Sequence, residues 1–100
     1  RYKWVGARAR LLNARILIKQ GKLSAALLQI EAAVHDSPKD VNILNTALNM
    51  YARAGLLRKA IDICQKIYKI TDNQQYKKRE ILLRNQIQME ILQKRTGGSK

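Results

Sequence analysis

The chain has 100 residues and carries 20 Lys and Arg against 7 Asp and Glu, which gives a formal net charge of +13. This length allows one small domain or a piece of a longer array, and the 46% of hydrophobic residues is enough for a core. The apolar runs are only a few residues long, which excludes a membrane-spanning helix because such a helix needs roughly 20 apolar residues.

The first third of the chain predicts two helices joined by a tight turn. Apolar residues recur with helical spacing and do not alternate as they would in a strand. We expect the first helix over residues 4–19, ending before Gly21, where the missing Cβ allows a turn with positive φ. Ser24 is the expected N-cap of a second helix over residues 25–35.

The middle of the chain predicts a second pair of helices. Residues 36–40 contain the single Pro and form a predicted turn, in which Asp40 is the expected N-cap of a third helix over residues 41–53. Gly55 is expected to end that helix, and a fourth helix is predicted over residues 57–70. The connections are short, so neighbouring helices are expected to be antiparallel.

The last third of the chain predicts one long amphipathic helix. A turn at residues 71–73 precedes this helix, which we expect over residues 74–94, and residues 96–100 predict a flexible tail without periodicity. One interpretation is a cap that covers the open end of the second helix pair, and another is a docking helix for a partner protein or ribosomal RNA. Its apolar residues are Ile81, Leu82, Leu83, Ile87, Ile91 and Leu92.

The helix–turn–helix pattern occurs twice at an interval of 34 residues. Small residues have a geometric reason in this pattern, because alanine lets the second helix of each pair approach the first closely. An interval of roughly 34 residues is typical of helical solenoids. The identical pairs at this interval include Gly21 and Gly55, Leu23 and Leu57, and Ala26 and Ala60.

The predicted fold is therefore all-α: an α-solenoid of two helix–turn–helix repeats with a period of ~34 residues, followed by a long C-terminal capping helix. We expect a single helical-repeat domain over residues 1–95. Within it, the first repeat spans about 7–40, the second about 41–73 and the capping helix about 74–95, before the tail at 96–100.

The two units resemble the tetratricopeptide and pentatricopeptide repeat families over residues 8–73. The second unit is similar to the pentatricopeptide signature over residues 45–55 and again at Ala60 and Ile61. The first family mostly binds protein segments and the second mostly binds single-stranded RNA in organelles, so the resemblance implies partners of these kinds. The tetratricopeptide-like spacing of the first unit is carried by Ala14, Leu17, Ala26, Ile30, Ala33 and Pro38.

In both families the first helix of each unit lines a concave face, and here that face is polar and basic. Basic side chains on it are expected to hold phosphates, and amides to hydrogen-bond base edges or a peptide backbone. The alternative is a solvated polar face that has no ligand. The residues that share this face are Arg8, Leu12, Arg15 and Lys19 on the first helix, and Asn42, Asn45, Thr46, Asn49 and Arg53 on the third.

The basic excess extends over the whole chain rather than being confined to a tail. Eight basic residues face three acidic ones in residues 1–50, and twelve face four in residues 51–100. Such a surface predicts a polyanionic partner, above all RNA. The alternatives are a basic protein whose charge serves only its solubility and one that balances an acidic neighbour in a complex. On the last helix the candidate contact residues are Lys77, Lys78 and Arg84, with Arg79, Lys94 and Arg95 on the same polar face.

The pairs of polar residues that read bases in pentatricopeptide repeats are only half present. Thr46 stands at the first reader position of the second unit, but Tyr76 stands where Asp or Asn is usual. In the first unit Leu12 replaces the polar reader that would pair with Asn42. We therefore expect contact with the shape and phosphates of structured RNA rather than the reading of single bases.

The sequence offers no residues in a catalytic or metal-binding pattern. It has one His, His35, and one Cys, Cys64, which stands where a repeat has a bulky packing residue and is expected to be buried. No Gly-rich phosphate loop is present. We expect neither an enzyme nor a cofactor, a metal or a small-molecule substrate.

Two functions follow from these observations. The first is a basic helical-repeat component of a ribonucleoprotein that contacts RNA and neighbouring protein subunits, such as a mitochondrial ribosome or an RNA-processing assembly. Because residue 1 is Arg rather than Met, a removed targeting segment is possible, and together with the resemblance this favours a mitochondrion or another organelle over the cytoplasm. The alternative is a tetratricopeptide-type adaptor that binds a peptide or a subunit in its concave groove.

Overall fold

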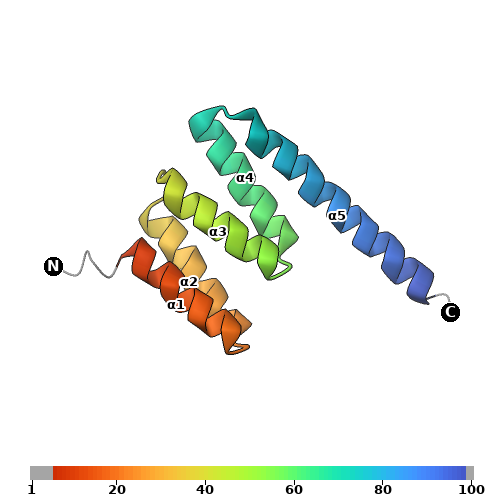
Figure 1. Cartoon of the computed structure of the whole chain (residues 1–100), viewed down its shortest axis with the longest axis horizontal. Coiled ribbons are helices and arrows are strands. Elements are labelled where there is room, and N and C mark those ends of the chain that lie inside the picture. Colours follow the sequence, from red (N-terminus) through yellow and green to blue (C-terminus); the bar gives the residue numbers. More distant parts are fainter. Residues whose placement is uncertain (1–5, 99–100) are drawn as a thin grey trace.

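The computed structural model describes residues 6–98, which are helical apart from short turns. Five α-helices follow one another in this range, and each hairpin of helices lies beside the next (Figure 1). This confirms an all-α protein. The helices are α1 (Ala7–Lys19), α2 (Leu23–Asp36), α3 (Val41–Arg53), α4 (Leu57–Thr71) and α5 (Gln74–Gly98).

Neighbouring helices in the chain are also neighbours in space. α1 packs against α2, α3 against α4, and α4 against α5, and both α1 and α2 also contact α3. The turns between these helices are two to four residues long, so each helix reverses the direction of the one before it (Figure 1). No helix within residues 6–98 has both the length and the apolar composition that crossing a membrane requires.

The two glycine turns have the same geometry, as the sequence predicts. Gly21 has φ +78° and Gly55 has φ +80°. After each glycine a backbone N–H reaches five residues back to close the preceding helix: Lys22 donates to Leu17 at 2.8 Å, and Leu56 donates to Tyr51 at 2.9 Å. This is the hydrogen bond of a Schellman helix end, which requires a left-handed residue and so favours glycine.

Asp40 caps α3 as the sequence predicts. Its Oδ1 atom accepts from the backbone N–H of Asn42 at 3.0 Å and from that of Ile43 at 3.3 Å. These are two of the N–H groups that have no partner inside the helix. With this cap α3 begins at residue 41 and ends at residue 53, the predicted bounds.

Several predicted helix boundaries differ from the structure. The predicted N-cap Ser24 lies inside the first turn of α2, whose N-cap is Lys22 and has no side-chain cap hydrogen bond. The reason is the Schellman turn, because α2 begins directly after the backbone of Lys22 has closed α1. The first helix begins at Ala7 with Gly6 as its N-cap, so the predicted start is wrong at residue 6, and its residues 4 and 5 lie outside the described range.

The predicted tail is wrong at residues 96–98, because α5 continues to Gly98 instead of ending at residue 94, and its residues 99 and 100 lie outside the described range. Extending a long helix adds one hydrogen bond for each residue fixed, and no Pro interrupts residues 95–98. The weak helix propensity of the two glycines, about 1 kcal/mol each, does not stop this extension. α4 is one residue longer than predicted and ends at Thr71.

The core consists of small and branched apolar side chains between the helices. Ala26 and Ala60, which the 34-residue interval pairs, are both fully buried, as is Cys64 at 1% exposure. Tyr51 is 3% exposed, whereas Tyr68 is only half-buried at the end of α4. The largest fully buried side chains are Ile30, Leu44, Leu48, Ile67 and Cys64.

The last helix covers α4 with only part of its apolar surface. Leu83 is buried and Ile87 is half-buried against the core. The prediction of one apolar face on an amphipathic capping helix is therefore incomplete, because apolar side chains also lie on other sides of α5. Those that remain exposed are Ile81, Leu82, Ile91 and Leu92, together with Met89.

We expect Gly21→Ala and Gly55→Ala each to lower the free energy of unfolding by about 1 kcal/mol, because an L side chain is disfavoured at positive φ. An added Cβ would meet no atom within 4 Å at either glycine, so the loss comes from the backbone alone. Chemical denaturation measures it. The matched variant Gly21→Asn should lose less, because Asn tolerates the left-handed region, and equal losses for Ala and Asn would contradict this explanation.

The capping residues give a second prediction. Asp40→Ala should lower the free energy of unfolding by about 1 kcal/mol, because it removes the acceptor for two backbone N–H groups of α3. Ser24→Ala should change it by less than about 0.5 kcal/mol, because Ser24 is exposed and caps no helix. Thermal or urea denaturation of both variants tests the assignment, and a larger loss for Ser24→Ala would reverse it.

Candidate polar groove between the first and third helices

A cavity of about 190 Å³ lies between α1 and α3, where the sequence places its candidate ligand-binding face. Arg8, Leu12 and Arg15 line it from α1, one helical turn apart. Asn42 and Thr46 line it from α3, and the apolar floor includes Leu11 and Ile43. We call this cavity the α1–α3 groove. The structure thus brings four of the predicted polar residues, two from each helix, to one place.

The position of the groove follows from which faces of the helices are buried. In α1 the buried residues Ala7, Leu11 and Ala14 follow helical spacing. Arg8 and Arg15 each come one residue after a buried alanine, so they lie at the edge of the buried face rather than opposite it. The contact of α1 with α3 then places that edge against the N-terminal half of α3.

The α1–α3 groove is positively charged. Arg8 and Arg15 are exposed, and no ion pair within the described range involves either of them. No Asp or Glu lines the groove. By contrast, the neighbouring Arg10 is paired with Asp36 at 3.0 Å between its Nε and Oδ2. Two arginines without a carboxylate partner make this groove suited to an anion, and an arginine fork matches phosphate oxygens well.

The polar side chains of α3 in the groove have mostly local partners. The Thr46 hydroxyl donates to the backbone carbonyl of Asn42 at 3.0 Å, which leaves its oxygen as an acceptor. Asn42 is exposed, and its side-chain amide has no hydrogen bond within the described residues. Asn42 therefore offers both a donor and an acceptor to a ligand next to the arginines.

The other predicted residues of this face do not line the groove. Lys19, Asn49 and Arg53 are exposed further along α1 and α3, beyond the cavity. Asn45 is turned toward α5, where its Oδ1 accepts from the hydroxyl of Tyr76 at 3.3 Å. The sequence did not reveal this contact, because it joins residues 31 positions apart.

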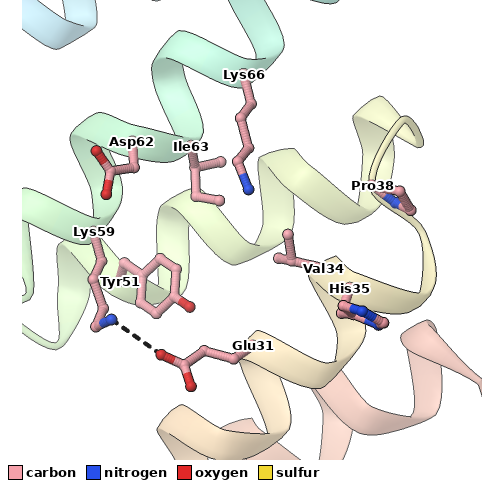
Figure 2. A pocket seen from close by; sticks show the side chains of 9 residues that line it. All are labelled: Glu31, Val34, His35, Pro38, Tyr51, Lys59, Asp62, Ile63 and Lys66. Carbon is pink, nitrogen blue, oxygen red and sulfur yellow. Dashed lines mark hydrogen bonds and ion pairs between the residues drawn. The ribbon is translucent and has the colours of Figure 1, made fainter.

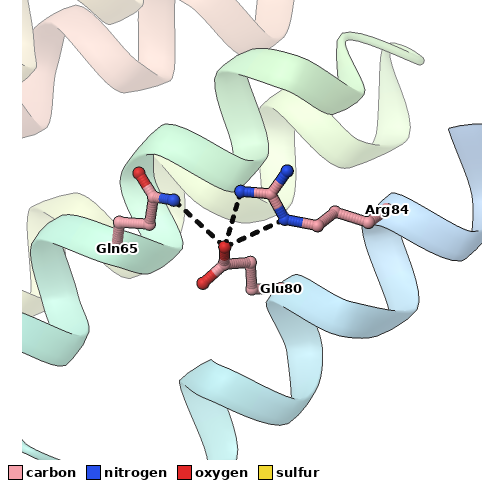
Figure 3. Close-up of polar contacts among 3 residues, drawn as sticks. All are labelled: Gln65, Glu80 and Arg84. Carbon is pink, nitrogen blue, oxygen red and sulfur yellow. Dashed lines mark hydrogen bonds and ion pairs between the residues drawn. The ribbon is translucent and has the colours of Figure 1, made fainter.

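The basic residues of α5 form no common site with the groove. Arg84 donates to Oε2 of Glu80 from Nε at 3.0 Å and from Nη2 at 2.8 Å (Figure 3). Gln65 of α4 donates to the same oxygen at 3.0 Å, and the hydrogen bonds from Arg84 and Gln65 hold the pKa of Glu80 below its ordinary value. Lys77 lies over the ring of Tyr68, with its Nζ 5.3 Å from the ring centre. Of the three predicted contact residues on α5, only Lys78 has neither a carboxylate nor an aromatic ring as a partner among the described residues.

A larger cavity, of about 460 Å³, lies between α2 and α4 (Figure 2). Its charges are mixed: Lys59 and Lys66 face Glu31 and Asp62, and Nζ of Lys59 is 3.0 Å from Oε2 of Glu31. The sequence analysis did not single out this cavity. Because its two positive and two negative side chains balance, it is less suited to a polyanion than the α1–α3 groove.

Tyr51 lies at the bottom of this larger cavity, and its hydroxyl points toward Glu31 in Figure 2. Burial of the phenol, followed by the negative charge of Glu31, raises the pKa of Tyr51 from 10.0 to about 12. Burial likewise raises the pKa of the Cys64 thiol, which keeps it in its unreactive protonated form. Among the described residues no cluster of three or more His, Cys, Asp or Glu is placed to hold a metal ion.

Comparisons of the chain with protein-family models, curated proteins and solved structures found no match. The described residues define a class of protein nonetheless: a basic, all-helical protein in which two similar helical hairpins leave a positively charged groove. What this groove binds has to be inferred from its residues and their geometry.

The raised pKa of Tyr51 predicts a loss of stability at high pH. The Tyr51 hydroxyl loses its proton near pH 10 in the unfolded chain and near pH 12 in the folded chain. The contribution of Tyr51 to the free energy of unfolding is therefore intact below pH 10 and is lost as the pH rises from 10 to 12. In this window the free energy of unfolding should fall on the order of 1 kcal/mol per pH unit more steeply than in Tyr51→Phe. Denaturation of both proteins between pH 9 and about 12 tests this, and parallel curves would contradict it.

Proposed function

We propose that the protein is a non-catalytic, basic helical-repeat component of a ribonucleoprotein. It contacts the phosphates of structured RNA through the α1–α3 groove and contacts neighbouring proteins through other surfaces. The observation that carries the RNA contact is the pair Arg8 and Arg15, which share a cavity with Asn42 and Thr46 and have no carboxylate partner.

In this proposal α1–α2 and α3–α4 are two stacked repeats of an α-solenoid similar to tetratricopeptide and pentatricopeptide repeats. The matching φ values of Gly21 and Gly55 and the matching backbone hydrogen bonds after them support it. So does the contact of both helices of the first hairpin with α3, the first helix of the second. In such a stack the first helices of successive units lie side by side and form the binding face.

The charge of the whole chain supports a polyanionic partner. A net charge of +13 on 100 residues creates a positive field that attracts RNA at long range and makes binding depend strongly on salt. The groove is the favoured point of contact because it brings two arginines without a carboxylate partner together with Asn42 and Thr46 in one cavity. A mitochondrial ribosome or another organellar RNA assembly would suit a short, basic repeat of this kind.

The reading of individual bases is not part of this proposal. The hydroxyl of Thr46 donates to its own helix, and that of Tyr76 donates to Asn45. Both residues stand at the positions that would read a base in a pentatricopeptide repeat. With these donors engaged, contacts to phosphates explain binding better than contacts to base edges.

The second candidate function is a tetratricopeptide-type adaptor that binds an acidic peptide or protein subunit in the same groove. Leu12 favours it, because this apolar side chain is 57% exposed between Arg8 and Arg15. A peptide with an apolar residue flanked by carboxylates would contact all three. RNA would use only the two arginines.

Salt dependence of RNA binding tests the proposal. The affinity for a short RNA hairpin falls as salt rises, so the slope of log affinity against log salt is negative. In Arg8→Gln/Arg15→Gln this slope should become less steep by roughly 1.4 to 1.8, because two phosphate contacts are lost. The control Arg58→Gln/Lys69→Gln removes the same charge from exposed positions of α4, outside the groove, and should change the slope less.

Fluorescence anisotropy measures these affinities at several salt concentrations. A hairpin of another sequence should bind equally well, since the contacts are to phosphates. Equal effects of the two double variants would place the RNA contact elsewhere. Weak RNA binding together with groove-dependent binding of an acidic, leucine-containing peptide would favour the adaptor.

A further inference from the structure

The side of α5 that faces away from α4 carries a stripe of exposed apolar side chains. Leu82 is 67% exposed, Met89 55% and Ile81 53%. Leu83 and Ile87, on the opposite side of the helix, are the residues that pack against the core. Single exposed leucines are common on protein surfaces, but several exposed apolar side chains on one side of a helix indicate a contact surface.

The spacing of this stripe suits another helix. Leu82 and Met89 are seven residues apart, and Asn85 lies between them at intervals of three and four. Alternating intervals of three and four place side chains on one seam, as in a coiled coil. Asn85 is a polar residue in this seam, where it favours a partner with a polar side chain at the same level. We call Ile81, Leu82, Asn85 and Met89 the outer face of α5.

Charge shows which kind of helix fits. The acidic residues of α5 are Glu80 and Glu90, and both lie toward α4: Glu80 accepts from Gln65, and Glu90 lines a cavity with the first residues of α4. The charged residues next to the outer face are basic. Lys78 stands four residues before Leu82 and so lies at the N-terminal end of the same seam, and Arg95 lies two heptads after Ile81. The outer face is thus apolar at Ile81, Leu82 and Met89, with a basic residue before it and another after it along the helix.

This face is accessible to a partner because it points away from α4, the helix that packs against α5. α4 has 15 residues and α5 has 25, so the part of α5 that follows the outer face extends beyond the beginning of α4 (Figure 1). At about 1.5 Å per residue the difference corresponds to roughly 15 Å of helix. Within the described residues no other helix contacts α5 besides α4 at the level of backbone packing.

We propose that the outer face of α5 docks an acidic amphipathic helix of a partner protein. The partner's apolar residues pack on Leu82 and Met89, a polar residue lies opposite Asn85, and its carboxylates face Lys78 and Arg95. A second copy of this chain is a poor partner, because it would bring a charge of +13 against +13 and no carboxylate at this face. RNA would gain nothing from the apolar stripe. The docking surface shares no residue with the α1–α3 groove, so it does not depend on the proposed RNA contact.

Two synthetic helical peptides test this proposal with the full chain. Both carry leucines in a heptad seam with one Asn, but one has Glu and the other Lys at the flanking positions. The Glu peptide should bind, and the Lys peptide should bind at least about tenfold more weakly. Leu82→Gln/Met89→Gln should weaken binding of the Glu peptide by at least about tenfold, because two buried apolar contacts are lost.

A matched control separates this face from general stickiness. Leu28→Gln/Ile16→Gln replaces apolar side chains that are 67% and 54% exposed on α2 and α1, nearly the same as Leu82 and Met89. This control should leave the affinity for the Glu peptide unchanged. In the unmodified chain, the Glu peptide should also protect Met89 from mild peroxide oxidation, whereas Met50, which is 6% exposed, is the protected internal reference.

Four outcomes would overturn the proposal. The first two are absence of Glu-peptide binding and equal weakening of that binding by the two double variants. The third is oxidation of Met89 by peroxide in the complex. The fourth is concentration-dependent self-association, measured by sedimentation, that Leu82→Gln/Met89→Gln abolishes. The last would make a second copy the occupant. If instead this variant weakened binding of the RNA hairpin and not of the peptide, the face would belong to the RNA contact. Loss of RNA binding in Arg8→Gln/Arg15→Gln with retained peptide binding leaves this inference intact.

Discussion

Close packing of two helices in each hairpin is the constraint on which the rest of the structure depends. Ala14 of α1 and Ala26 of α2 are completely buried, and so are Ala47 of α3 and Ala60 of α4. Side chains this small allow the helix axes to approach closely, and interaxial distance depends on the residues at the contact. The glycine turns serve the same packing, because a left-handed residue lets the chain reverse within two or three residues. A larger residue in place of one of these alanines would push the helices apart, and with them the groove that they form.

The polar surface follows from this packing rather than from charge alone. Once the alanine-containing faces are buried, the residues beside them lie at the edges of the helix contacts, and Arg8 and Arg15 come to line a cavity with Asn42 and Thr46. A few basic residues elsewhere are paired with carboxylates, as Lys59 is with Glu31 and Arg84 with Glu80. Exposed pairs of this kind add little to stability. They do lower the local positive charge, so a formal charge of +13 is spread unevenly over the surface.

The fifth helix, α5, has apolar side chains on the side that packs against the core and also on the side exposed to solvent. Leu83 and Ile87 complete the core beside α4, whereas Leu82 and Met89 remain exposed on the other side. Tyr76 ties the beginning of the helix to Asn45 of α3, which fixes its position relative to the second hairpin. An element with apolar residues on both sides is typical of a helix placed between two packing partners, since exposing several apolar side chains on one face to water is unfavourable.

By itself the sequence determined the features that depend on a few neighbouring residues. These were the helical class, the two glycine turns, the Asp40 cap with the bounds of α3, and the burial of Ala26, Ala60 and Cys64. Helical spacing, capping and positive φ are local properties, so they can be predicted from short segments. The tertiary structure alone decided which of the residues expected on one face line a common cavity, namely Arg8 and Arg15 with Asn42 but not Lys19 or Arg53. It alone decided the contacts of Asn45 with Tyr76 and of Arg84 with Glu80. It also decided which side of α5 stays exposed. The reason is that such contacts depend on how helices distant in the chain pack and cross, and no short segment contains that information.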